Sequence, residues 1–298
     1  MNLREVGEDR LLEKLLRHLP LGRGVIVGVG DDCAVVESGK RGPLTLLKTD
    51  CLVEGIHFAK DSRPEDVGWK AMARPLSDFA AMSGVPQFAL VTLIVPSGRD
   101  VAWVTRLYRG IAKAARSFDV AVVGGETSNI KGPAVISVSV TGFVEKTRWV
   151  DRAGGKPGDE LFVTGRLGGS MGGHHLKFVP RIVESRWLTK NFRIRAMMDL
   201  SDGLGTDLPR LARASEVSFE IEQDALPRNR RCTVRQAIAD GEDYELLFAV
   251  SANDSRLLLT RWRKKFPKVP LTRIGHLKSK IENRKSKFPR GYVHFEKR

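Results

Sequence analysis

The sequence predicts an α/β protein with two domains. Short apolar stretches of strand length alternate with longer amphipathic stretches of helical length, which is typical of α/β domains. The chain has 298 residues, enough for two hydrophobic cores. A connector rich in Gly and Pro, 151–159, lies near the middle. We therefore expect one domain over residues 1–150 and a second over residues 151–298.

The first half of the chain predicts strands that alternate with three helices. The expected strands are 25–29, 44–47, 88–95, 120–123 and 134–141, and the expected helices are 11–19, 66–82 and 101–118. Pro75 lies inside the second of these helices and should kink it or split it in two. Lys70, Arg74 and Asp78 follow at four-residue intervals on the same helix, as in a stripe of surface ion pairs. The small apolar neighbours of Asp78 suggest instead that this carboxylate is partly buried.

The second half repeats the alternation. We expect strands at 160–164, 194–198, 217–221 and 246–250, and helices at 206–214, 234–239 and 254–262. Between the first two strands lies a glycine-rich loop, Gly168 to Gly173, that could wrap phosphates. The chain contains neither the GxxxxGK[ST] phosphate loop nor the GxGxxG dinucleotide fingerprint, so those two nucleotide-binding classes are excluded.

Composition limits the partners and the compartment. The net charge of +15 would attract polyanions, but the basic residues are scattered and no nucleic-acid-binding motif accompanies them, which argues against a nucleic-acid partner. No apolar stretch is long enough to cross a membrane, and the N-terminus lacks the features of a signal peptide. The three cysteines have no metal-ligand spacing and suit a reducing environment. We therefore expect a cytoplasmic protein.

Acidic residues gather where the expected strands and helices end. In the stretch 197–204, Asp199 and Asp202 lie three residues apart at the end of a strand and the start of a helix. Helix capping would explain one of these residues but not both. Similar acids stand in Gly-Asp-Asp (30–32), Thr-Asp (49–50), Ser-Asp (77–78), Gly-Gly-Glu (124–126) and Gly-Glu-Asp (241–243).

Oxygen ligands without histidine or cysteine pairs suit Mg²⁺ better than zinc or copper. Mg²⁺, glycine-rich turns and a few arginines together form the usual site of phosphoryl transfer. Solvated surface turns would also supply acids, but would not place them so regularly after strands. The pattern therefore favours a magnesium-dependent phosphoryl-transfer site.

These motifs, in this order, resemble those of the thiamine-monophosphate kinases, a branch of the aminoimidazole ribonucleotide synthetase superfamily. The resemblance runs nearly end to end and rests on Gly-Asp-Asp-Cys-Ala (30–34), Thr-Asp-Cys-Leu-Val-Glu-Gly-Ile-His-Phe (49–58), Leu-Ser-Asp-Phe-Ala-Ala-Met (76–82), Asp-Leu-Ser-Asp-Gly-Leu (199–204) and Gly-Glu-Asp-Tyr-Glu-Leu (241–246). It implies transfer of the γ-phosphoryl group of ATP to thiamine monophosphate by direct in-line attack. It also implies a homodimer in which the N-terminal sheet joins its twin in a barrel, and an active site in the cleft between the two domains.

The resemblance implies a role for each matching position. The implied magnesium ligands are Asp32, Lys48 (through its backbone carbonyl), Thr49, Asp50, Asp78, Glu126, Asp199 and Asp202. The implied ATP contacts are Tyr108, Gly125, Glu126, Arg152 and Ser201, and the implied thiamine-phosphate contacts are His57, Glu242 and Tyr292. Asp199, Asp202 and Arg152 are expected to be catalytic. The acceptor phosphate is ionised at neutral pH, so no strong general base is needed.

The chain departs from the family pattern at several places. Lys48 replaces a small hydroxyl residue, Glu126 replaces aspartate, and Arg74-Pro75 replaces a small apolar residue and asparagine. The segment between Gly173 and Asp199 is shorter than usual, and Val293 replaces an aspartate. These departures bear on the number of metal ions, the rate and the substrate fit more than on the fold.

Two other functions compete with the kinase. One is another ATP-dependent synthetase of the same superfamily; His57 and the C-terminal Gly-Tyr-Val-His-Phe (291–295) argue against it. The other is a basic nucleic-acid-binding or inactive relative. Retention of nearly all the acids argues against inactivity, because buried carboxylates without a use are destabilising.

Overall fold

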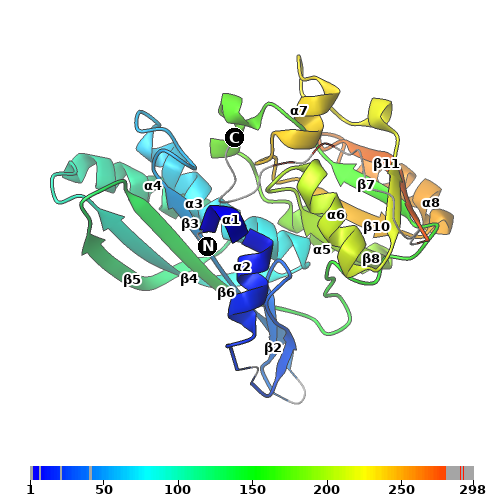
Figure 1. Ribbon diagram of the computed structural model, residues 1–298, viewed down its shortest axis with the longest axis horizontal. Coiled ribbons are helices and arrows are strands. Elements are labelled where there is room, and N and C mark those ends of the chain that lie inside the picture. Colours follow the sequence, from blue (N-terminus) through cyan, green and yellow to red (C-terminus); the bar gives the residue numbers. More distant parts are fainter. Residues whose placement is uncertain are drawn as a thin grey trace. The chain divides into compact units, whose positions relative to one another are not determined.

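The computed structural model describes residues 3–6, 8–20, 22–39, 42–279, 289 and 291, and it confirms the α/β class. The chain forms two compact units (Figure 1). We call the first, Met1–Asp31 with Asp151–Ser170 and Ile194–Arg298, the antiparallel unit, and the second, Asp32–Val150 with Met171–Arg193, the mixed-sheet unit. Each unit combines segments from both sides of the connector at 151–159, which differs from a single division at residue 150.

The mixed-sheet unit contains β2 (Ala34–Glu37), β3 (Leu44–Val53), α3 (Pro64–Ala81), β4 (Val85–Val95), α4 (Val101–Ser117), β5 (Ala121–Asn129), β6 (Val135–Val144) and α5 (Ile182–Asn191). Its strands follow the order β2-β3-β6-β4-β5. Of these neighbours only β4 and β5 are parallel, and α4 makes the crossover between them. Figure 1 shows α3 and α4 side by side along this sheet.

The two faces of the mixed sheet have opposite character. On β6, Ile136, Val138 and Val140 are buried, while Ser137 and the other alternate residues are only partly covered. This alternation confirms the half-exposed antiparallel strand expected at 134–141, because successive side chains of a strand point to opposite faces. The sheet therefore has one core face and one open face.

One of the two alternatives for Pro75 and one expected strand end in this unit were wrong. Helix α3 is not split at Pro75: it runs unbroken through that residue, since both of its halves bury apolar side chains such as Met72 and Leu76. Strand β5 does not end at residue 123 but continues through Gly124 and Gly125. A Cβ atom on Gly125 would lie 1.8 Å from the carbonyl oxygen of Val91, so the glycine is required by close strand packing.

The antiparallel unit contains α1 (Leu3–Val6), α2 (Glu8–Leu16), β1 (Val25–Val27), β7 (Glu160–Thr164), β8 (Ile194–Asp199), α6 (Leu204–Ala214), β9 (Ser218–Ile221), α7 (Val234–Ala239), β10 (Leu246–Val250), α8 (Ala252–Lys265) and β11 (Leu271–Lys278). Its sheet has the order β8-β10-β7-β11-β9, with antiparallel neighbours throughout. Short 3₁₀ turns lie at η1 (Ser170–Gly172), η2 (His174–Leu176) and η3 (Gln223–Ala225), of which η2 belongs to the mixed-sheet unit. Helices α6 and α7 share one hydrophobic core with the sheet.

Two strands, β2 and β11, were not expected from the sequence pattern. Strand β2 has only four residues, and in β11 polar and glycine residues such as Arg273 and Gly275 separate the apolar ones. The register of β11 against β7 shifts at that same place. None of the helices within the described part of the chain is long and apolar enough to span a membrane.

The backbones of helices α3 and α4 lie in direct contact, and this close packing in the mixed-sheet unit can be tested. A Cβ atom on Gly68 would lie 2.0 Å from the carbonyl oxygen of Leu107. We expect Gly68→Ala to push the helices apart and to lower the free energy of unfolding by about 2 kcal/mol, as overpacking does. Gly98→Ala is the matched control, because nothing lies within 4 Å of that position. Urea unfolding curves measure both, and equal midpoints would contradict the close approach.

Candidate active site

The mixed-sheet unit brings together carboxylates that are far apart in the sequence. Asp32 lies just before β2, and Asp78 lies in the last turns of α3. Their side chains come within 4.8 Å of each other, and the residues are only 1% and 8% exposed. The expectation that Asp78 is buried is therefore confirmed. Two carboxylates so close in a poorly hydrated place repel each other unless a cation or donor lies nearby.

Two cations of the chain face this acidic group. Lys48 Nζ lies 2.9 Å from Oδ1 of Asp78, and an Arg74 guanidinium nitrogen lies 3.7 Å from Oδ1 of Asp50. Burial alone would raise the pKa of the Asp50 carboxyl, but Lys48 and Arg74 more than offset this and hold that pKa below its usual value. Burial alone would lower the pKa of Lys48, but Asp78 and Asp50 raise it above the ordinary lysine value. Lys48 is therefore a fixed positive charge.

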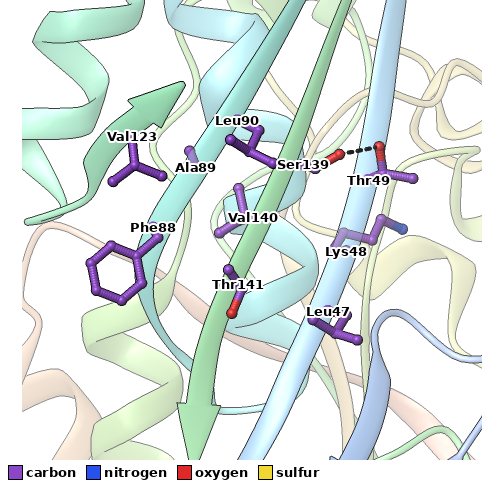
Figure 2. A pocket seen from close by; sticks show the side chains of 10 residues that line it. All are labelled: Leu47, Lys48, Thr49, Phe88, Ala89, Leu90, Val123, Ser139, Val140 and Thr141. Carbon is purple, nitrogen blue, oxygen red and sulfur yellow. Dashed lines mark hydrogen bonds between the residues drawn. The ribbon is translucent and has the colours of Figure 1, made fainter. Parts of the chain in front are cut away.

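Thr49 lies on the other face of β3 from Lys48 and Asp50, since neighbouring residues of a strand alternate. Its hydroxyl accepts a hydrogen bond of 3.0 Å from Ser139 on the open face of the sheet (Figure 2). The structure thus groups Lys48 with Asp50 and Asp78 but does not bring the Thr49 hydroxyl to them.

His57 is held by its backbone and by its ring. The backbone N–H of Val53 donates to His57 Nδ1 at 3.0 Å, and Lys70 Nζ donates to the His57 carbonyl oxygen at 2.7 Å. Lys70 Nζ also lies 2.8 Å from Nδ1 of His175 in η2. Lys70 is fully buried, so its interpretation as part of a surface stripe was wrong. Lys70 is buried because other segments pack around α3, and the four-residue spacing in the sequence did not indicate that packing.

A second acidic group lies in the antiparallel unit, where β8 ends and α6 begins. Asp199 is 2% exposed, and the backbone N–H of Asp202 donates to Oδ2 of Asp207 at 3.0 Å. Arg210 contacts both Asp202, at 2.5 Å, and Asp207, at 3.2 Å. Burial and the nearby charge of Asp202 raise the pKa of Asp207 well above its usual value. Sequence reasoning missed Asp207; its spacing of three residues from Arg210 on α6 was the available signal.

The turn that carries Glu242 lies along the residues that follow β8. The N–H of Glu242 donates to the Ser201 carbonyl oxygen at 2.7 Å, and the N–H of Tyr244 donates to that of Leu200 at 2.8 Å. Glu242 and Tyr244 have φ values of 55° and 52°, a conformation that non-glycine residues seldom adopt. Such strain persists only where the surroundings enforce it, and it is frequent at functional sites. The structure therefore brings Glu242 and Ser201 together.

The glycine-rich loop at 168–170 is not open to phosphate, contrary to the expectation. The N–H of Gly168 donates to the Asp243 carboxylate at 3.0 and 3.2 Å, and the N–H of Gly169 donates to Asp240 at 2.8 Å. Ser170 also donates its hydroxyl proton to Asp243. Burial raises the pKa of Asp243 to about 7 in spite of these donors. Acidic residues of the chain itself thus occupy the amides that a phosphate would need.

The remaining expected contacts belong to both units. Arg152 donates its backbone N–H to Asp31 at 3.1 Å, and its guanidinium donates to the Gly30 carbonyl oxygen at 3.3 Å. Tyr108 lies half-exposed on α4, and Glu126, next to Gly125 on β5, is exposed. Tyr292 lies outside the described residues. Its neighbour Gly291 is described, and a Cβ atom there would meet the Asp202 carbonyl oxygen at 2.3 Å.

The chemistry of these donors fits a hard divalent cation. Asp32 and Asp78 offer only oxygen atoms, both are buried, and no histidine or cysteine joins them in the group that the described residues form. Mg²⁺ prefers such carboxylate oxygens, together with water and phosphate oxygens.

Comparison with known proteins first defines the class. Residues 30–144 match the family described as AIR synthase related protein, N-terminal domain. These residues include most of the mixed-sheet unit, so the match covers the acids of that unit.

Relatives over nearly the full length define the family. The thiamine-monophosphate kinase of Rhodopirellula baltica is 36% identical, and the similarity covers 94% of each chain. A solved structure described as AaThiL complexed with AMPPCP and TMP has a TM-score of 0.83 and 31% identity and covers 99% of each chain. The crystal structure of thiamine monophosphate kinase from Aquifex aeolicus has a TM-score of 0.75 at 31% identity and covers 95% of this chain and all of that one. The chain belongs to the thiamine-monophosphate kinase family.

The raised pKa of Asp243 predicts a dependence of stability on pH. Below the unfolded pKa of about 3.8 both states bind the proton; between that value and about 7 the unfolded state loses it first, so the free energy of unfolding falls as the pH rises. Asp243→Asn has no proton to lose. Between about pH 5 and about pH 8, the free energy of unfolding of the variant should therefore rise by about 3 kcal/mol relative to that of the parent chain. Urea unfolding at both pH values measures this gain, and a difference that does not change with pH would contradict it.

Proposed function

We propose that the chain transfers the γ-phosphoryl group of ATP to thiamine monophosphate and so forms thiamine diphosphate. The observation that carries this proposal is the similarity over 99% of each chain to AaThiL, which was solved with AMPPCP, an ATP analogue, and TMP. The buried carboxylates Asp32, Asp78 and Asp199 support it, because folding retains them at the cost of their hydration. A synthetase of the same superfamily has no comparable support, since the similar hydrogenase maturation proteins are below 20% identical.

The chain's own residues bind and orient the substrates in this proposal. Asp199 and Asp202 would hold the metal of the nucleotide, and Arg210 fixes the Asp202 carboxylate at 2.5 Å. Ser201 and Glu242, joined by their backbone hydrogen bond, line the positions of ATP and of thiamine phosphate. The attacking phosphate oxygen of the acceptor carries a negative charge at neutral pH, so catalysis depends on positioning and charge neutralisation.

The other expected contacts keep their proposed roles. The magnesium ligands would be Asp32, Lys48 (through its backbone carbonyl), Thr49, Asp50, Asp78, Glu126, Asp199 and Asp202. Tyr108, Gly125 and Arg152 would contact ATP, and His57 and Tyr292 the thiamine phosphate. Bound Mg²⁺ would supply the neutralisation of phosphate charge. The three free cysteines support a reducing, cytoplasmic location.

We also propose a homodimer that pairs the open faces of two mixed sheets in a barrel. A hollow of about 420 Å³ on this face is lined by Leu47, Lys48, Thr49, Phe88, Ala89, Leu90, Val123, Ser139, Val140 and Thr141 (Figure 2). Leu47, Phe88 and Leu90 are each about half exposed, and Val123 is 60% exposed. Apolar side chains gathered in this way on a sheet favour burial against a partner, and a second copy offers the same face.

The first test is the reaction itself. The purified chain, incubated with ATP, Mg²⁺ and thiamine monophosphate, should produce thiamine diphosphate, measured by chromatography. Asp202→Asn should lower the turnover at least about 100-fold, because it removes a fixed charge from the transferring group. It should affect the thermal midpoint far less. Asp224→Asn, an exposed acid of η3, is the matched control and should keep the parental turnover. No product from the parent chain would refute the function, and parental turnover in Asp202→Asn would refute the role of that residue.

The dimer has a separate test. Leu90→Glu places a charge on the open face and should convert the dimer to monomers in sedimentation velocity experiments, since burial of an unpaired charge is costly. Val101→Glu changes an apolar residue that is 76% exposed on α4 and should leave the dimer intact. A parent chain that sediments as a monomer would contradict the proposal.

A further inference from the structure

The acids of the mixed-sheet unit already have cations of the chain as partners. Lys48 Nζ lies 2.9 Å from Asp78, and the Arg74 guanidinium lies 3.7 Å from Asp50. The four side chains are between 11% and 22% exposed, so both ion pairs are largely excluded from solvent. The Coulomb attraction within such pairs exceeds that on an open surface, although the loss of hydration of both charges opposes it.

Rigid elements hold both cations in place. Lys48 and Asp50 lie on the same face of β3, two residues apart, and Arg74 and Asp78 lie one turn apart on α3. Arg74 also donates to the Cys51 carbonyl oxygen at 2.8 Å, which ties α3 to β3. The pairing of charges therefore follows from the packing of one helix on one strand, and it does not depend on a mobile loop.

The charge of the Asp50–Asp78 pair is consequently small. Lys48 and Arg74 bring one positive charge to each of its two carboxyl groups. A divalent ion that bound between Asp50 and Asp78 would lie close to the Lys48 ammonium and would be repelled by it. Lys48 and Arg74 are also two of the positions at which the sequence departs from the family pattern.

We propose that the Lys48 ammonium, assisted by Arg74, occupies the Asp50–Asp78 pair in place of a divalent cation, so that this chain binds fewer divalent ions than its carboxylates suggest. The inference rests on the proposed function for the choice of ion, and it revises that proposal in one respect: Asp50 and Asp78 would not together bind a divalent ion. The Lys48 ammonium then neutralises the Asp50–Asp78 pair even when no metal is present, because it is part of the chain.

Mn²⁺ binding to the full-length protein, with neither nucleotide nor thiamine monophosphate present, tests the inference. Isothermal titration calorimetry and the electron paramagnetic resonance signal of free Mn²⁺ give the number of ions bound and their affinity. Lys48→Gln, which removes the charge and leaves a polar side chain one atom shorter, should bind one more Mn²⁺ per chain or bind Mn²⁺ at least about tenfold more tightly. Lys131→Gln makes the same change of charge at an exposed position of the same unit and should match the parent.

A second variant and a second measurement complete the test. Arg74→Gln should shift Mn²⁺ binding in the same direction, and Mg²⁺ should raise the melting temperature of Lys48→Gln more than that of the parent. Identical Mn²⁺ binding by the parent, Lys48→Gln and Arg74→Gln would overturn the inference. A variant that folds only when Mn²⁺ is present would support it, because the ion then replaces the missing ammonium. The ion count is independent of turnover, so a failure of the kinase assay and a failure of this inference are distinguishable.

Discussion

The protein keeps several carboxylates in its interior, where an ionised oxygen must exchange its water for cations or hydrogen-bond donors. The residues concerned are Asp32, Asp78, Asp199, Asp207 and Asp243, which are at most 8% exposed. Each such group costs stability when it is left unpaired, and the cost rises as the surroundings become drier. The contacts around these carboxylates therefore constrain how the strands and helices that carry them can pack.

The two units stabilise their buried carboxylates in different ways. In the mixed-sheet unit, Lys48 and Arg74 bring positive charge from β3 and α3 to the acids, and the pKa of Asp50 stays low. In the antiparallel unit a single Arg210 serves two acids, and burial raises the pKa of Asp207 well above its ordinary value. One unit thus neutralises its acids with cations, and in the other burial also raises the pKa of the Asp207 and Asp243 carboxyls.

Much of the fold could be predicted from local sequence, and less of the site. The alternation in β6 and the apolar run before Asp199 are properties of neighbouring residues, and the structure agrees with both. Lys70 was misjudged because its burial depends on packing between α3 and segments far away in the chain. Asp207 was missed for a similar reason: its importance arises from the turn that brings it to the N–H of Asp202.

Negative charge and backbone strain coincide in the turn at Glu242, and this coincidence bears on function. Glu242 and Tyr244 adopt positive φ values that cost about 1 kcal/mol or more each. Hydrogen bonds to Ser201 and Leu200 offset that cost only while the end of β8 keeps its position. The same segment carries Asp199 and Asp202, so the stability of the turn and the placement of these acids depend on each other. Substitutions that relieve strain or charge here should therefore stabilise the fold while they weaken catalysis, which is the usual trade-off at a preorganised site.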